Sequence, residues 1–141
     1  MKSIGYIIFS LLSMVPTGIH AQSISIAKYA DNRQAAISFT FDDGLKEQYT
    51  ILFPKMQELG IKGTFCLIGS RMNQQPKNHE KQTFSWEQAK EMAQDGQEMT
   101  SHGYGHKNVS KLTQDELRYE VQHNDTLIYQ HTGIFPRTYF Y

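Results

Sequence analysis

The sequence has a single cysteine, Cys66, among its 141 residues, and it carries no excess of charge of either sign. One cysteine cannot form a disulfide within the chain, so packing and hydrogen bonds must hold the fold together. Cys66 lies in a strand-like apolar run, where we expect a buried, small apolar side chain rather than a reactive thiol. The 14 basic residues are matched by 14 acidic ones, which excludes the basic footprint of a nucleic-acid-binding protein.

Long hydrophobic runs are also missing. The N-terminal apolar run, residues 4–15, is too short to span a bilayer. It follows Lys2, is broken by Pro16 and leads to a plausible cleavage site at Ala21, an order typical of a secretory signal peptide. We therefore expect a signal peptide over residues 1–21 and no transmembrane segment after its removal. The protein is then expected to be secreted or to lie in the periplasm or cell envelope; a short buried helix is the alternative interpretation.

The segment 35–44, AAISFTFDDG, ends in two neighbouring carboxylates. Its apolar side chains recur at every second position, the period of a half-buried strand: Ile37, Phe39 and Phe41. Asp42 and Asp43 then stand at the strand end, before a glycine that can turn the backbone sharply. Two unpaired carboxylates so close would repel each other. A cation site is one interpretation of this strand end, and a solvated turn is the other.

The remaining chain alternates between helical and strand patterns. The predicted helices cover residues 46–59, 86–94 and 114–131, and the predicted strands cover residues 35–41, 61–68, 97–101 and 134–141. Residues 69–83 are polar and predict a surface loop. This order of elements predicts an α/β domain with a parallel sheet, in which chemistry collects at the carboxyl ends of the strands.

Local signals fix several helix boundaries. Pro54 should kink or restart the first helix. Thr83 or Ser85 can cap the second helix, with Glu87 or Gln88 as the reciprocal partner, and Thr113 with Glu116 can cap the third. Four apolar residues are expected to line the inner side of the third helix: Leu117, Val121, Leu127 and Ile128.

Two histidines, His102 and His106, follow the predicted strand 97–101. A spacing of four can bring two imidazoles to one ion in a helical turn or a tight loop, and Gly103 and Gly105 favour the loop. With one carboxylate the pair would form a His-His-Asp set that suits Zn²⁺ with an open position for water. A structural or surface role is the alternative for each histidine alone. Because the acidic pair also follows a strand, we expect both pairs at the same edge of the sheet.

These motifs resemble those of the polysaccharide deacetylases of the NodB-homology type, also called carbohydrate esterase family 4. Residues 40–44, Thr-Phe-Asp-Asp-Gly, match the family's first motif, and residues 102–106 correspond to its second, His-(Ser/Thr)-x-x-His. The similarity spans most of residues 35–141, after a leader segment over residues 22–34. It implies a distorted (β/α)₇ barrel, truncated in this chain to about its first half.

The resemblance also implies roles for individual residues. Asp43, His102 and His106 would hold a divalent metal, most often Zn²⁺, with Co²⁺ or Fe²⁺ as alternatives. Asp42 would be the general base that takes a proton from the attacking water. The substrate would be an N-acetylated sugar of a polysaccharide or oligosaccharide, and hydrolysis of its amide C–N bond would release acetate and a free amine. Tyr104, inside the histidine loop, could stack on a sugar ring or pack over the loop.

The sequence departs from the family pattern at three places. Gly103 stands where the family has Ser or Thr, so a hydroxyl that braces the histidine loop is absent. Arg137 is only a doubtful substitute for the arginine of the third motif. The later motifs have no counterpart before the chain ends, so we expect little or no turnover from this chain alone. Two further interpretations therefore stay open: a catalytically inactive carbohydrate-binding relative, and an O-acetyl esterase acting on xylan.

Overall fold

The computed structural model describes residue 26 and residues 28–73 and 82–141, so the predicted signal peptide lies outside the described residues. The chain divides into two compact units, Met1–Ala36 and Ile37–Tyr141. The first contains a short 3₁₀ turn over Ala30–Asn32, and the second contains the other helices and strands found among the described residues. Among the described residues, no helix combines the length and apolar character needed to cross a bilayer.

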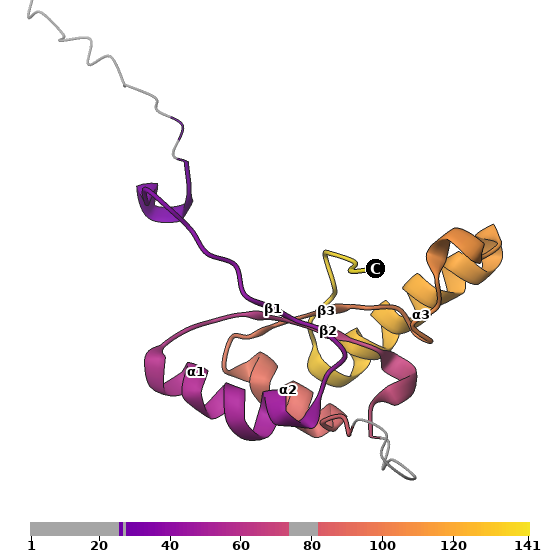
Figure 1. Ribbon diagram of the computed structural model, residues 1–141, viewed down its shortest axis with the longest axis horizontal. Helices are drawn as coiled ribbons and strands as arrows, with labels where there is room; N and C mark the ends of the chain where they lie inside the picture. The colour runs from indigo at the N-terminus through magenta and orange to yellow at the C-terminus, as the bar shows by residue number, and fades with distance from the viewer. Residues whose placement is uncertain (1–25, 27, 74–81) are drawn as a thin grey trace, which may run out of the picture. The chain divides into compact units, whose positions relative to one another are not determined.

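Three parallel strands form the centre of the second unit (Figure 1). They are β1 (Thr40–Phe41), β2 (Thr64–Leu67) and β3 (Glu98–Ser101), in the order β1-β2-β3. Thr40 lies opposite Thr64, and Leu67 lies opposite Ser101. All four residues of β2 are buried, as predicted for a strand that is covered on both faces of a parallel sheet. The predicted parallel α/β order is therefore confirmed.

The first helical segment contains a change of helix type at the predicted proline. A π-helical turn over Gln48–Leu52 leads into α1 (Phe53–Leu59), and Pro54 stands in the first turn of α1. The Phe53 N–H bonds the carbonyl of Gln48, five residues back. Proline has no N–H to donate, so the α-helix restarts here, as the sequence predicts, and it ends at the left-handed Gly60.

Two helices begin with the predicted caps. Helix α2 (Trp86–Gln94) follows Ser85, whose hydroxyl accepts the Gln88 N–H while the Gln88 side chain accepts the Ser85 N–H. Helix α3 (Gln114–Thr132) begins with the same reciprocal arrangement of Thr113 and Glu116. Each box satisfies two backbone donors that the helix itself leaves unpaired.

The core lies between the sheet and the helices. Helices α1 and α2 lie on the same side of the sheet (Figure 1), and α3 packs against α2 and β3. Phe65 of β2 is at its centre, with its ring 5.1 Å from that of Phe41 and 6.5 Å from that of Phe84. Further fully buried core residues are Leu67, Ala89, Met92, Met99 and Ile128.

Two predictions of burial are wrong in this structure. Ile37 is 80% exposed and Phe39 43% exposed. The ladder between β1 and β2 begins at Thr40, opposite Thr64, and Phe39 before it contributes only its carbonyl, which accepts the Thr64 N–H at 2.9 Å. Leu117 is 37% exposed, although it lies on the same stripe of α3 as the buried residues Glu120, Asn124 and Ile128. Val121 and Leu127 are partly buried.

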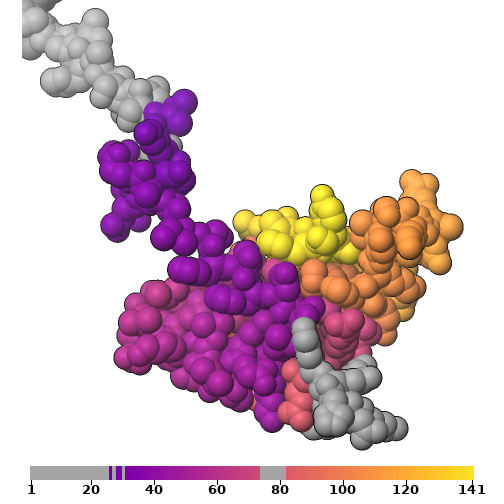
Figure 2. Space-filling view, viewed as in Figure 1, coloured from indigo at the N-terminus to yellow at the C-terminus, as the bar shows by residue number. Residues whose placement is uncertain are grey.

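The predicted strand 134–141 is present only as one bridge. Tyr139 pairs in parallel with Ser101, and the Phe140 N–H donates to the Ser101 carbonyl at 2.9 Å. Figure 2 shows these C-terminal residues, in yellow, beside the orange residues that follow β3. The predicted loop 69–83 is partly buried, because Gly69 and Met72 pack inward, and its residues 74–81 lie outside the described residues.

Candidate metal centre

Asp43 reaches the site through a left-handed turn that directly follows β1. Its φ is 71°, and Gly44 after it has a φ of 67°. Aspartate tolerates this conformation better than most residues. A side chain at Gly44 would also meet Met72 at 3.4 Å and Leu67 at 3.5 Å. The pair Asp43-Gly44 therefore provides the tight turn that directs the carboxylate across the carboxyl end of the sheet.

His102 and His106 reach the same place from the loop that follows β3. His102 is 9% exposed and follows the last strand residue, Ser101. The loop then turns through Gly103 (φ 81°), and His106 itself is left-handed (φ 55°). These turns fold the second imidazole back onto the first, so that the two Nε2 atoms lie 3.1 Å apart.

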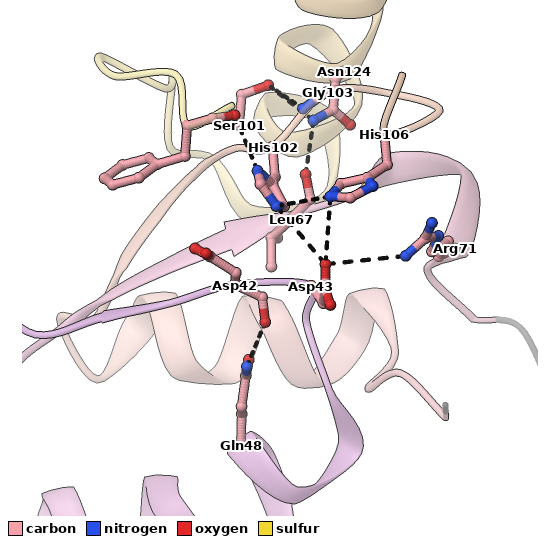
Figure 3. Close-up of polar contacts among 11 residues, drawn as sticks. Asp42, Asp43, Gln48, Leu67, Arg71, Ser101, His102, Gly103, His106 and Asn124 are labelled. Carbon is pink, nitrogen blue, oxygen red and sulfur yellow. Dashed lines mark hydrogen bonds and ion pairs between the residues drawn. The ribbon is translucent and has the colours of Figure 1, made fainter. Parts of the chain in front are cut away.

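The three predicted metal ligands converge (Figure 3). The Nε2 atoms of His102 and His106 each lie 3.8 Å from Oδ1 of Asp43, and the three ligand atoms lie within 4.8 Å of one another. Tetrahedral ligands bound at 2.0–2.1 Å would be separated by about 3.4 Å. The separations in this structure lie close to that value, so the donor set fits a small divalent cation.

A backbone carbonyl sets the tautomer of His102. Its Nδ1 lies 3.0 Å from the carbonyl oxygen of Phe140. A carbonyl only accepts hydrogen bonds, so Nδ1 carries the proton and Nε2 presents its lone pair towards Asp43 and His106. This is the usual way in which proteins orient a histidine that binds a metal.

Arg71 is a charged neighbour that the sequence interpretation did not identify. It ends a 3₁₀ turn over Gly69–Arg71, directly after β2, and its Nη1 lies 4.0 Å from Oδ1 of Asp43. Its side chain is 44% exposed. The contact supplies positive charge at the Asp43 carboxylate, and the position of Arg71 after the central strand is the signal that could have indicated it.

Asp42 does not join this cluster. Its side chain is exposed and lies beside the three ligands rather than among them (Figure 3), and its backbone carbonyl accepts a 2.6 Å hydrogen bond from Gln48 Nε2. Cys66 is buried, as predicted, and its thiol contacts the Asp42 carboxylate. Burial, followed by the contact with the Asp42 carboxylate, raises the pKa of the Cys66 thiol. The base role of Asp42 stays a prediction.

An open pocket of about 350 Å³ lies beside the two histidines. Its wall consists of His102, His106, Lys107, Asn108, Val109, Tyr139 and Tyr141.

Tyr104 is not part of this wall, because its ring meets those of Tyr119 and His123 edge-on, at 5.5 and 4.6 Å. Its substrate contact therefore stays a prediction. Arg137 lies by a hollow with Gly96 and Glu98, at the opposite end of β3 from His102.

Two buried polar residues of α3 support the strand ends, and the sequence interpretation missed both. Asn124 accepts the Gly69 N–H at 2.9 Å and donates to the Leu67 carbonyl at 2.8 Å and to the Ser101 hydroxyl at 2.9 Å. Glu120, one turn earlier, is 1% exposed. Their spacing of four, in line with the buried Ile128 four residues later, is the signal that could have indicated an inward polar pair.

Comparison with known proteins agrees with this geometry. The family model described as polysaccharide deacetylase matches residues 29–141. The peptidoglycan-N-acetylglucosamine deacetylase of Bacillus cereus is 26% identical over 105 residues, which cover 74% of this chain and 34% of the relative. The chain thus spans about a third of the length of that relative.

Two solved structures show the same fold. The Streptococcus pyogenes deacetylase PplD in complex with acetate superposes with a TM-score of 0.67 at 18% identity, over 76% of this chain and 46% of that one. A family 4 acetyl xylan esterase from Clostridium thermocellum in complex with a cobalt ion gives 0.60 at 21% identity, over 72% and 46%. These likenesses confirm the predicted fold class, an α/β barrel of which this chain covers about half.

Proposed function

The chain belongs to the polysaccharide deacetylase family, and on that premise we propose that it is part of a metal-dependent hydrolase that removes acetyl groups from N-acetylated sugars of a polysaccharide. The observation that carries the proposal is the convergence of Asp43, His102 and His106 on one point. The reaction adds water across the amide C–N bond and releases acetate and a free amine. Because the chain spans about a third of its curated relative, the activity is proposed for the intact protein.

We propose that Asp43, His102 and His106 hold the cation, with Zn²⁺ favoured and Co²⁺ or Fe²⁺ as alternatives. Two imidazoles and one carboxylate suit Zn²⁺ and leave a position open for water. When bound, the cation lowers the pKa of water to about 7 and polarises the scissile carbonyl. Asp43 and His102 are mostly buried, whereas the His106 side chain is 43% exposed, so the open pocket adjoins the cation position from the side of His106.

The protein residues divide the remaining work. The Phe140 carbonyl keeps the proton of His102 on Nδ1, so that Nε2 stays available as a ligand. Asp42, outside the ligand set, is proposed as the general base that takes a proton from the attacking water. Tyr104 packs against α3, so its proposed contact with sugar would require the exposed edge of its ring.

A second candidate function is favoured by one comparison. The esterase from Clostridium thermocellum shares this fold, and the same attack of water would cleave an O-acetyl ester. The relative from Bacillus cereus, by contrast, is a peptidoglycan deacetylase. We favour an N-acetylated glycan of the cell wall as the substrate, and a secreted or cell-envelope location is the corresponding proposal.

One set of assays on the intact protein tests these alternatives. Metal content should be close to one cation per chain, and acetate release from N-acetylglucosamine oligomers should stop on chelation and return with Zn²⁺ or Co²⁺. Acetylated xylan serves as the ester substrate in parallel. Release from xylan alone would favour the esterase. Bound metal with release from neither substrate would favour an inactive carbohydrate-binding relative, and absence of bound metal would refute the metal-dependent hydrolase.

A further inference from the structure

We propose that Glu120 of α3 is a positioning residue, which holds the loop from His102 to His106 in the shape that brings the two imidazoles together. The inference rests on the proposed metal-binding function. It concerns a residue that lies outside both motifs of the site and comes from a helix that contributes no metal ligand.

Glu120 binds two successive amides of the loop. The Tyr104 N–H donates to its backbone carbonyl at 3.0 Å, and the Gly105 N–H donates to its carboxylate Oε2 at 2.7 Å. Both amides lie between the two histidines, in a segment with no helix or strand of its own. Glu120 thus holds the middle of the loop with both its backbone carbonyl and its side chain. The bond to the carboxylate is the stronger of the two, because hydrogen bonds to a charged acceptor are about twice as strong as neutral ones.

The two loop glycines allow this close approach. A Cβ built at Gly105 would lie 3.0 Å from Oε1 of Glu120, and one built at Gly103 would lie 3.2 Å from Oε2 and 2.9 Å from the Tyr139 hydroxyl. Contacts of 3.0 Å are tighter than ordinary packing allows. Gly103 lacks the hydroxyl that was expected to brace the loop. The space that a side chain at this position would fill is occupied by Glu120 and Tyr139, and Glu120 of α3 holds the loop instead.

The burial of Glu120 indicates a specific role rather than a general contribution to stability. The side chain is 1% exposed, and its Oε1 accepts no hydrogen bond from the residues that the structure describes. Its nearest cation is Lys107, the residue after His106, whose Nζ lies 3.7 Å from Oε1. Burying a carboxylate is costly unless it is well paired, and an apolar residue would often give equal or greater stability. A buried carboxylate at this place is therefore accounted for by its contacts with the histidine loop.

Metal affinity is the measurement that tests this inference. In the intact protein, Glu120→Ala should weaken the binding of Zn²⁺ and Co²⁺ about 10- to 100-fold, as measured by competition with a chelator, because outer contacts of metal ligands commonly have effects of that size. Glu120→Gln keeps an acceptor for the Gly105 N–H and should recover most of the affinity. The visible spectrum of the Co²⁺ form should change in Glu120→Ala and return towards wild type in Glu120→Gln.

Ile128→Ala is the matched control, because Ile128 is fully buried in the hydrophobic core two turns further along the same helix. It should lower thermal stability without changing metal affinity or the Co²⁺ spectrum. Gly105→Ala is a second variant that keeps the carboxylate but pushes the loop away from it, and it should also weaken metal binding. If Glu120→Ala does not fold, the metal affinity of Gly105→Ala tests the positioning role of Glu120.

The outcomes separate this inference from the proposed function. A wild-type protein without metal affinity would refute the proposed function itself. A wild-type protein that binds metal, together with Glu120→Ala and Gly105→Ala variants of unchanged affinity and spectrum, would refute only the positioning role of Glu120.

Discussion

His102 and Phe140 are joined by a 3.0 Å hydrogen bond between the imidazole Nδ1 and the backbone carbonyl, across 38 positions of the sequence. The same short segment donates the Phe140 N–H to the carbonyl of Ser101, directly before His102. The segment around Phe140 therefore fixes the tautomer of a proposed metal ligand while it pairs with β3, the strand that precedes His102. Pairing of the C-terminal segment with β3 and the protonation pattern of the His102 imidazole therefore depend on the same residue, Phe140.

Metal binding should stabilise the folded protein, because the three ligands converge only when β1 and β3 are both in place. We expect Zn²⁺ at 100 times its dissociation constant to add about 2.7 kcal/mol to the free energy of unfolding, measured by thermal denaturation with and without the ion. Asp43→Asn should remove most of this effect. Asp115→Asn changes a 95% exposed carboxylate and should leave it intact. An equal response of both variants would place the ion elsewhere.

Loss of the proposed base should separate catalysis from metal binding. Asp42 lies outside the ligand cluster, so Asp42→Asn should reduce the rate of acetate release about 10²- to 10⁴-fold while the metal content stays at the wild-type level. Steady-state rates and metal analysis of the same preparation check this. Glu47→Gln, an exposed acid on the following helix, is the control. Simultaneous loss of metal would identify Asp42 as a ligand instead.

Removal of the Asn124 amide should destabilise the fold strongly. Asn124 is fully buried, and its side-chain amide forms hydrogen bonds with Leu67, Gly69 and Ser101. Asn124→Ala would leave buried backbone groups unpaired, so we expect a loss of about 3 kcal/mol in the free energy of unfolding, measured by urea denaturation. Gln122→Ala, on the exposed side of the same helix, should stay within about 0.5 kcal/mol of wild type. A small effect at Asn124 would mean that water replaces the amide.

Asp95 should contribute to the acid sensitivity of the fold. Hydrogen bonds from Lys62, Gln57 and Gln97 hold the pKa of its carboxyl low, at about 2. The lowered pKa means that the folded state binds the proton less readily than the unfolded chain, so the contribution is present above about pH 4 and is lost as the pH falls through about 2.

The variant Asp95→Asn tests this pH dependence. Wild-type protein should lose more stability than Asp95→Asn between pH 4 and pH 2 in urea titrations. Glu58→Gln removes an exposed acid that pairs with Lys55 at 2.7 Å and should keep the wild-type slope. Parallel curves for wild type and Asp95→Asn would exclude a role for Asp95 in the acid response.

The sequence predicted the elements whose signals are local. The caps at Ser85 and Thr113 and the restart at Pro54 depend on neighbours within a few residues, and all three are present. The convergence of Asp43 with the two histidines followed from a general property of parallel sheets, whose strands end at one edge, and the structure brings these residues together.

What the sequence did not indicate depends on distant partners. Ile37 and Phe39 show a strand pattern, but the ladder with β2 begins only at Thr40, and both side chains are exposed. Glu120 and Asn124 look like surface residues of a helix, because their partners lie 15 to 57 positions away in the sequence. Hydrophobic periodicity and residue propensity describe a single helix or strand. Whether a polar side chain is buried depends on the hydrogen-bond partners that distant parts of the chain place next to it.

The parallel order of the sheet determines when during folding the proposed cation site can form. Asp43 and the histidine pair are separated by roughly sixty residues, and only the docking of β1 and β3 on either side of β2 brings them into contact. A newly made, still extended chain offers just the weak pair of imidazoles. Capture of the proposed cation would therefore be a late event in folding, and tight binding of the ion would require that β1 and β3 have both docked on β2.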